Sequence, residues 1–131
     1  MRVVITGGAG FLGKLLAAKI LQRGELTDSA GALQPVTELV LVDMAAATGE
    51  PWLADKRVSQ IVGDVAERSV LAQALTPNTG SIFHLAAVVS GQAEADFDIG
   101  MRVNVDATRT LLELTRTLPT PPKFVFTSSI A

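Results

Sequence analysis

The sequence has 131 residues, of which 48% are hydrophobic and 18% charged, and a formal net charge of -2. This length and composition predict one globular domain with a buried core, and the slight acidity gives no reason to expect nucleic acid or a membrane as a partner. No apolar run approaches the roughly 18 residues of a membrane span, and the absence of cysteine excludes disulfides and thiolate metal sites, which fits a cytoplasmic protein.

The first third of the chain begins with an apolar run and continues with a helical pattern. Residues 2–6 (RVVIT) predict a buried strand. Residues 11–23 predict a helix, because leucine and isoleucine recur at a spacing of four, and Gly24 supplies its C-terminal stop. Residues 25–36 predict a polar loop or a partly helical excursion, and residues 37–42 (TELVLV) predict a second strand.

The same alternation continues through the rest of the chain. After a connection of uncertain form, the pattern predicts in order a strand at residues 58–62, a helix at 66–75, a strand at 81–85, a long helix within 96–117 and a strand at 123–127. Strands that alternate with helices predict crossover connections and a parallel sheet, and near-continuous apolar strands indicate a sheet covered on both faces. We therefore expect an α/β fold with a doubly wound parallel sheet, the Rossmann fold, in the strand order 3-2-1-4-5.

Three glycines stand between the first predicted strand and the first predicted helix. Gly7, Gly10 and Gly13 form the pattern G-x-x-G-x-x-G. At such a site one glycine permits a tight turn, a second lets a pyrophosphate approach the backbone, and a third lets the helix pack closely on a strand. An ordinary glycine-rich turn is the alternative, but the strand–turn–helix context favours a dinucleotide bound at the helix N-terminus.

Two aspartates follow predicted strands. Asp43 ends the second strand, where its carboxylate could accept hydrogen bonds from an adenosine ribose; the alternative is a turn aspartate. The polar loop over residues 25–36 explains why Asp43 lies beyond the usual spacing of about 20 residues from the glycines. No arginine follows Asp43 to meet a 2′-phosphate, which favours NAD over NADP. Asp64 could contact the adenine amino group, form a capping box with Glu67, or do both.

The remaining polar candidates are interpreted as structural. His84 is the only histidine, and because it stands alone in a predicted strand we interpret it as a core residue. With no second histidine and no cysteine, no metal site is expected. Asp96 and Asp98 are interpreted as caps of the long helix rather than as an acid–base pair.

Five motifs now resemble, in order and spacing, the extended short-chain dehydrogenase/reductase family of the NAD-dependent epimerase/dehydratase type. They are T-G-G-A-G-F-L-G (6–13), G-D-V (63–65), H-L-A-A (84–87), V-N-V-D-A-T (103–108) and F-T-S-S (126–129). The family includes nucleotide-sugar epimerases, dehydratases and NAD-dependent dehydrogenases. The long loop before residues 37–43 and the stretch A-A-V-V-S-G-Q-A-E-A-D-F-D (86–98) are similar to dehydrogenases that oxidise small sugar acids such as D-erythronate.

The resemblance implies NAD as cofactor and a role for each matching position. The implied cofactor-binding residues are Gly7, Gly10, Phe11, Leu12, Gly13, Asp43, Asp64, Val65, Leu85, Ala86, Ala87, Asn104 and Ser128. Residues 7–13 would bind pyrophosphate, Asp43 the ribose, and Asp64 with Val65 the adenine. Residues 85–87 would line the cofactor. Asn104 would be the structural asparagine of the long helix, and Ser128 would line the nicotinamide side.

The resemblance also implies residues close to the substrate. Ser90, Gly91 and Gln92 would lie near it, and Ser129 would be the catalytic serine that hydrogen-bonds the substrate oxygen. Without the family resemblance, the polarity of Ser128 and Ser129 is explained equally well by the end of a strand.

One feature departs from the family. The base of the family is the tyrosine of Y-x-x-x-K. Free tyrosine has a pKa of about 10, and the family relies on the lysine and the cationic nicotinamide to make it a useful base near neutral pH. This chain contains no tyrosine. We therefore interpret residues 1–131 as the incomplete N-terminal NAD-binding domain of a longer, homodimeric enzyme that oxidises a hydroxyl of a small sugar acid, and we expect this piece alone to be inactive. A nucleotide-sugar epimerase or dehydratase with tightly bound NAD, and a non-catalytic dinucleotide-binding module, are the alternatives.

Overall fold

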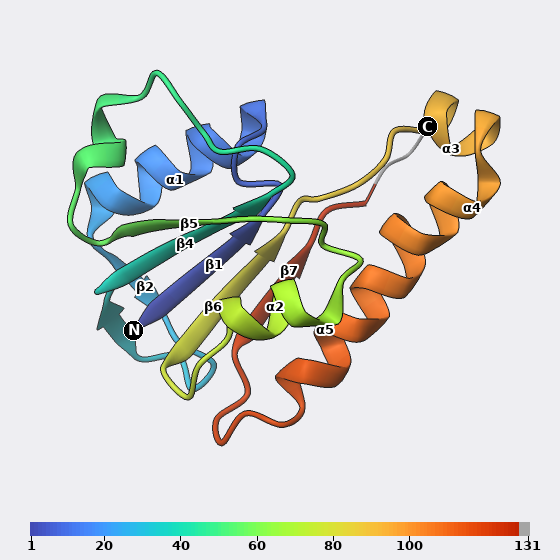
Figure 1. Cartoon of the computed structure of the whole chain (residues 1–131). Coiled ribbons are helices and arrows are strands. Elements are labelled where there is room, and N and C mark those ends of the chain that lie inside the picture. The colour runs from blue at the N-terminus through green and yellow to red at the C-terminus, as the bar shows by residue number, and fades with distance from the viewer. Residues whose placement is uncertain (129–131) are drawn as a thin grey trace.

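The computed structural model describes residues 1–128, and its centre is a five-stranded parallel sheet (Figure 1). The central strand β1 (Arg2–Thr6) is flanked on one side by β4 (Glu38–Asp43) and then β5 (Val58–Val62), and on the other by β6 (Thr79–His84) and then β7 (Lys123–Phe126). Counted in chain order, these five strands have the order 3-2-1-4-5. The predicted doubly wound Rossmann topology is confirmed.

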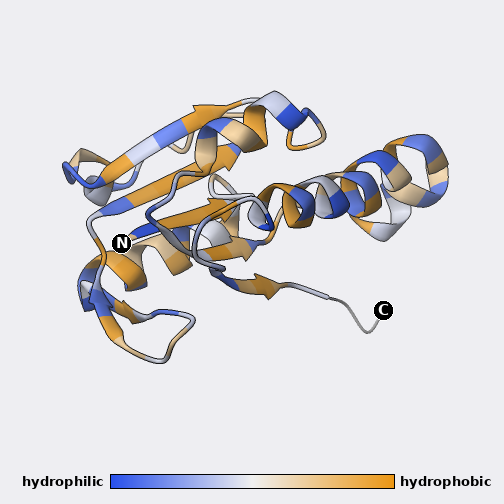
Figure 2. Ribbon diagram, turned by 90° about the horizontal axis from the view of Figure 1, so that it is seen from below, coloured by the Kyte–Doolittle hydropathy of each residue, from blue (hydrophilic) through white to orange (hydrophobic). Residues whose placement is uncertain are grey.

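Helices cover both faces of this sheet. Successive residues of each strand point to opposite sides, so alternate residues pack against helices on opposite faces. On one face Val3 and Ile5 of β1 pack with α1 (Phe11–Arg23) in one apolar cluster. On the other face Val4 packs in a second cluster with α2 (Arg68–Ala74) and α5 (Ala107–Thr115). The hydrophobic colouring of Figure 2 is concentrated on the central strands. Both faces are therefore buried, as the near-continuous apolar strands predicted.

The segment over residues 25–36 differs from the prediction. It forms a two-stranded antiparallel hairpin of β2 (Glu25–Thr27) and β3 (Leu33–Pro35) instead of a loop with helical character. The Asp28 carboxylate accepts the backbone N–H groups of Ala30 and Ala32, both at 2.9 Å, and so holds the hairpin turn. Strands of three residues are too short to show a sequence period, which is why the pattern missed them.

The connection between β4 and β5 contains a single turn of 3-10 helix, η1 (Pro51–Ala54). Trp52 and Leu53 of this turn pack against the α1 face of the core. The uncertain connection is thus an ordered cover of the sheet rather than a free loop.

The predicted long helix within residues 96–117 is formed without a break by α4 (Phe97–Gly100), the π-helix η2 (Met101–Asp106) and α5 (Ala107–Thr115). A separate short helix that the sequence did not predict, α3 (Ser90–Ala95), precedes it. The carboxylate of Asp96 accepts the Ile99 N–H at 3.1 Å and caps α4, with Asp98 in its first turn, so that the interpretation of these aspartates as caps is confirmed. Within residues 1–128 no helix combines the length and the apolar composition that a membrane crossing needs.

Candidate functional site

The chain turns sharply from the end of β1 into α1. Gly7 has φ +71°, in the left-handed region, and a Cβ there would lie 2.8 Å from the backbone nitrogen of Ala86. A Cβ on Gly13 would collide with the Gly7 carbonyl oxygen and lie 2.7 Å from the Cα of Gly8. Gly7 therefore occupies the tight turn, and Gly13 the close contact between helix and turn.

The middle glycine of the motif has a different environment. Gly10 is exposed and is the N-cap of α1, and a Cβ there would meet only the Gly7 carbonyl oxygen, at 3.2 Å. No side chain caps this helix end. Gly10 thus leaves open space beside the N-terminus of a 13-residue helix, whose free N–H groups and dipole favour an anion.

Asp43 joins the end of β4 to this turn. One carboxylate oxygen accepts the Ala9 N–H at 2.9 Å, and the other accepts the Met44 N–H at 2.7 Å. The structure therefore gives Asp43 the turn role that was the alternative in the sequence. The ribose role stays a prediction and is compatible with this geometry, because each carboxylate oxygen can accept a further hydrogen bond.

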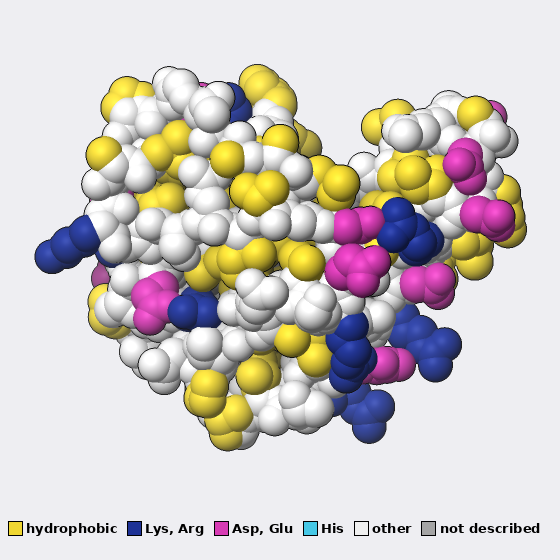
Figure 3. Space-filling view, viewed as in Figure 1, with side chains coloured by type: hydrophobic (Ala, Val, Ile, Leu, Met, Phe, Trp, Pro, Cys, Tyr) yellow, Lys and Arg dark blue, Asp and Glu magenta, His cyan; other side chains and the backbone are white. Residues whose placement is uncertain are grey.

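A cavity of about 480 Å³, here called the β4-side cavity, opens at the carboxyl ends of the strands. It is lined by Gly7, Gly10, Asp43, Met44, Asp64, Val65, Leu85, Ala86, Ala87, Val88, Gln92, Ile99, Arg102 and Val103. Figure 3 shows this part of the molecule hollowed between the sheet and the α3–α4 segment. In doubly wound sheets ligands bind at this edge, where the strand order reverses beside the first strand.

Asp64 lies in the β4-side cavity with two partners. Its Oδ1 accepts the Ala66 N–H at 2.8 Å, and its Oδ2 lies 2.7 Å from a guanidinium nitrogen of Arg102, a residue of η2. The predicted capping box with Glu67 is wrong, because α2 begins at Arg68 and Glu67, at its N-cap, makes no side-chain capping bond. The sequence carried no signal for Arg102, since only the fold brings η2 to the loop after β5.

A second cavity of about 470 Å³, here called the β7-side cavity, lies on the other side of the segment that follows β6. It is lined by Leu85, Ala86, Ala87, Val88, Val89, Ser90, Asn104, Phe126, Thr127 and Ser128. Residues 85–88 line both cavities and so form a shared wall between them. The amide of Asn104 holds the end of this wall, because its Oδ1 accepts the Val88 N–H at 2.8 Å and its Nδ2 donates to the Val88 carbonyl at 3.0 Å.

Most of the predicted site residues lie in these two cavities, but four of those within residues 1–128 do not. Phe11 and Leu12 present exposed side chains in the first turn of α1, and Gly13 is buried behind the turn. Gly91 is exposed on helix α3. The predicted catalytic residue Ser129 lies outside the described residues.

His84 lies at the end of β6, and its side chain is 1% exposed. Its Nδ1 is 2.6 Å from the Thr6 hydroxyl and its Nε2 is 2.9 Å from the Thr108 hydroxyl, and the rings of Phe124 and Phe126 lie near it. Burial lowers the pKa of His84, because the charged form loses its hydration. The interpretation of His84 as a core residue is confirmed.

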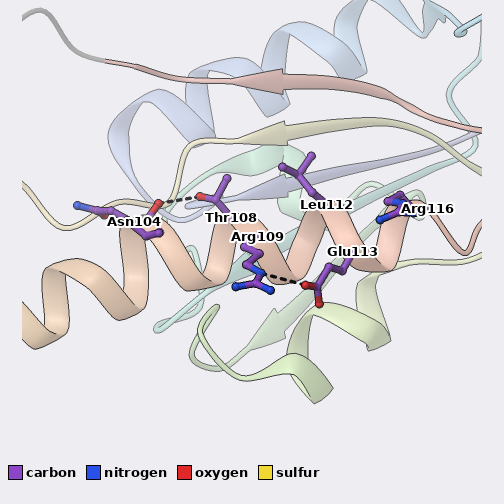
Figure 4. A pocket seen from close by; sticks show the side chains of 7 residues that line it. Asn104, Thr108, Arg109, Leu112, Glu113 and Arg116 are labelled. Carbon is purple, nitrogen blue, oxygen red and sulfur yellow. Dashed lines mark hydrogen bonds and ion pairs between the residues drawn. The ribbon is translucent and has the colours of Figure 1, made fainter.

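A third hollow, of about 570 Å³, follows the outer side of α5 and η2 (Figure 4). It is lined by Asn104, Val105, Thr108, Arg109, Leu112, Glu113 and Arg116. All of these residues belong to one continuous helical segment, and Arg109 and Glu113 pair with each other at 3.1 Å. This hollow is therefore the surface of one helix, and Arg68 of α2 reaches it only through an ion pair with Glu113 at 3.3 Å. Nor do residues 1–128 gather three His, Asp or Glu side chains in a way that could hold a metal ion.

Comparison with known proteins agrees with this geometry. The family model described as NAD dependent epimerase/dehydratase family matches residues 3–131. The chain belongs to this family. A curated family relative, D-erythronate dehydrogenase from Cupriavidus necator, is 54% identical over 131 residues, which are 100% of this chain and 39% of that protein. The chain thus spans only about two fifths of the length of two curated relatives, 39% of one and 38% of the other.

Solved structures of an epimerase and of a dehydratase have the same fold as this chain. The nucleoside-diphosphate-sugar epimerase from Agrobacterium tumefaciens is 35% identical with a TM-score of 0.84, and the match covers 100% of this chain and 38% of that one. DesIV, a dTDP-glucose 4,6-dehydratase from Streptomyces venezuelae solved with NAD and TYD bound, is 28% identical with a TM-score of 0.70. That match covers 88% of this chain and 35% of the other.

Proposed function

We propose that residues 1–131 are the NAD-binding domain of a dehydrogenase that oxidises a hydroxyl of a small sugar acid such as D-erythronate. The observation that carries the cofactor assignment is the pair of cavities that meet at the wall over residues 85–88. A dinucleotide has two halves joined by a pyrophosphate, and this arrangement offers one cavity for each half. The substrate assignment is supported by the 54% identity with the Cupriavidus necator dehydrogenase.

The residues of the β4-side cavity fit the adenosine half of NAD. The open space at Gly10 lets a pyrophosphate reach the N-terminus of α1, which a Cβ would narrow. Asp43, Asp64 and Val65 line this cavity; we assign Asp43 to accept hydrogen bonds from the ribose hydroxyls, and Asp64 with Val65 to contact adenine. These groups bind and orient; NAD, when bound, supplies the acceptor for the hydride.

The β7-side cavity fits the nicotinamide half and the substrate. Ser90 and Ser128 offer hydroxyls there, and we assign Ser129, the next residue after Ser128, the role of orienting the substrate oxygen. Serine is an effective base only as its alkoxide, and its pKa is too high for that form to be present unaided near pH 7. The described residues of this cavity offer no side chain that titrates near neutral pH, so we propose that the base lies outside residues 1–128.

A nucleotide-sugar epimerase is the second candidate, and the 35% identity with the Agrobacterium tumefaciens epimerase favours it. An epimerase returns the hydride to its substrate and keeps its cofactor, whereas a dehydrogenase releases NADH. The two are separated by incubating the full-length protein with NAD and either D-erythronate or UDP-sugars. Stoichiometric release of NADH with the sugar acid supports the dehydrogenase, and interconversion of UDP-sugars without NADH release contradicts it.

The cofactor site is tested by Gly10→Val in the full-length protein. A branched side chain would enter the space beside the helix N-terminus, so we expect NAD to bind at least about tenfold more weakly, which corresponds to about 1.4 kcal/mol. Ala72→Val is the matched control, because Ala72 is exposed on α2 and lines neither cavity. If calorimetric titration of the folded Gly10→Val protein gives the wild-type Kd, the glycine turn is not the cofactor site.

A further inference from the structure

A chain of hydrogen bonds runs through the buried imidazole of His84 and connects β1 with α5. On one side the Thr6 hydroxyl lies 2.6 Å from Nδ1 and also accepts the Ala86 N–H at 3.3 Å. On the other side the Thr108 hydroxyl lies 2.9 Å from Nε2 and donates to the Asn104 carbonyl at 2.9 Å. Every polar atom of the imidazole therefore has a partner.

One tautomer satisfies all of these groups together. Because the Thr108 hydroxyl gives its hydrogen to the Asn104 carbonyl, its oxygen is free to accept from Nε2–H. Nδ1 then carries no hydrogen and accepts from the Thr6 hydroxyl, whose oxygen accepts the Ala86 N–H. The opposite tautomer would leave the Thr6 hydrogen without an acceptor, and an imidazolium would do the same.

The two ends of this chain are the two anchors of the shared wall over residues 85–88. At the near end, Thr6 accepts from Leu85 N–H through its carbonyl at 3.1 Å and from Ala86 N–H through its hydroxyl. At the far end, the Asn104 amide makes two hydrogen bonds with the backbone of Val88. His84 thus connects both anchors, although it does not line either cavity itself.

We propose that His84 is a positioning residue: as a neutral imidazole bonded to Thr6 and Thr108, it fixes residues 85–88 as the wall of both cavities and thereby sets the affinity for the dinucleotide. The proposal rests on the function proposed above. A residue that only filled the core would be replaceable by any side chain of similar size, whereas this role needs an acceptor at Nδ1 and a donor at Nε2.

The test uses Thr108, because it contacts His84 but is only half-buried and its substitution changes little volume. In the full-length protein, Thr108→Val removes the acceptor for Nε2–H, and Thr108→Ser restores it. We expect Thr108→Val to raise the Kd and KM for NAD about fivefold, as for the loss of one buried hydrogen bond. Thr108→Ser should return both to within about twofold, and kcat at saturating NAD should stay within about twofold throughout.

The control is Thr115→Val, which removes another α5 hydroxyl that bonds a preceding carbonyl, that of Leu112, at 2.7 Å. It has no contact with His84 and should lower the melting temperature without changing the Kd for NAD. Equal Kd values for wild type, Thr108→Val and Thr108→Ser would overturn the proposal, as would equal weakening in Thr108→Val and Thr115→Val.

A second variant tests the histidine directly. His84→Gln keeps one acceptor and one donor, whereas His84→Phe keeps the volume alone, so Gln should bind NAD more tightly than Phe. If both variants fail to fold, the Thr108 pair still decides. If Gly10→Val also leaves NAD binding unchanged, the proposed function fails; if Gly10→Val weakens binding and the Thr108 variants do not, the role of His84 alone fails.

Discussion

The two cavities have nearly equal volumes, about 480 and 470 Å³, and share the wall over residues 85–88, but their polar groups differ in kind. The β4-side cavity contains ionised groups, and Asp43 and Asp64 are each held by backbone N–H groups, Asp64 also by Arg102. The described lining of the β7-side cavity offers hydroxyls and one amide. The first cavity is therefore organised for recognition of a polar ligand, and the second provides hydrogen bonds without a strong acid or base.

The strongest way to break this comparison is to destroy the β4-side cavity through its glycine turn. Gly13→Ala places a methyl group against the Gly7 carbonyl oxygen and 2.7 Å from the Cα of Gly8, both backbone atoms that cannot turn away. We expect a loss of about 3 kcal/mol in the free energy of unfolding, the upper part of the range for overpacking, together with loss of NAD binding. Chemical denaturation measures the first and calorimetry the second.

The control for this change is Gly91→Ala, since nothing lies within 4 Å of a Cβ at Gly91 on helix α3. Alanine there should leave the stability unchanged or raise it by up to about 1 kcal/mol, because it favours the helix. Equal stabilities for Gly13→Ala and Gly91→Ala would contradict the close packing of the turn.

The next largest effect sharpens the contrast in charge. If Asp43 binds the adenosine ribose as proposed, its carboxylate would repel the 2′-phosphate of NADP, so the full-length protein should prefer NAD in kcat/KM by more than about tenfold, or about 1.4 kcal/mol. Asp43→Asn should reduce this ratio by most of that factor. The ratio of kcat/KM with NAD to kcat/KM with NADP is the right measurement, because loosening of the turn weakens the binding of both cofactors alike.

Asp28→Asn is the matched control for Asp43→Asn. The Asp28 carboxylate also accepts two backbone N–H groups, from Ala30 and Ala32, but it lies in the β2–β3 hairpin. It should leave the NAD/NADP ratio unchanged. A wild-type enzyme that uses both cofactors equally would show that Asp43 does not select between them.

The smallest effect tests whether Ser90, in the β7-side cavity, contacts the substrate rather than the cofactor. Ser90→Ala removes a hydroxyl from that cavity, and we expect the KM for the sugar acid to rise about fivefold, the worth of one neutral hydrogen bond, with the Kd for NAD unchanged. Ser69→Ala, on the exposed side of α2, is the control. A Kd for NAD that rises with the KM would place Ser90 beside the cofactor instead.

The parts of the molecule that the sequence predicted well depend on local signals. The bounds of β1 and α1 agree with the prediction at every end. The apolar run and the glycines mark the end of β1 and the start of α1, and Gly24 marks the end of α1. The strand order followed from the alternation of strands and helices together with the right-handed crossover rule for doubly wound sheets. The glycine turn was found from its local motif, and Asp43 from its position at the end of a predicted strand.

The parts that the sequence could not predict depend on contacts between distant segments. The ion pair of Asp64 with Arg102 and the amide bonds of Asn104 with Val88 exist only because the fold brings η2 to the segments that follow β5 and β6. The π-helical stretch η2 within the long helix was not predicted either, because a π-helix changes the spacing on which periodic patterns depend. Predicted residues therefore lie in the cavities, while the interactions that hold them there were not foreseen.

The position of β1 has a consequence for how the protein is made. β1 is the central strand and is synthesised before both of its neighbours, β4 at residues 38–43 and β6 at residues 79–84. At about 5–20 residues per second, its second edge stays without a partner for on the order of several seconds. During that time a nascent chain presents Val3, Val4 and Ile5, all of them fully buried in the folded protein, to solvent and to chaperones. Slow translation upstream of β6 would lengthen that exposure, whereas the same delay after β6 would not.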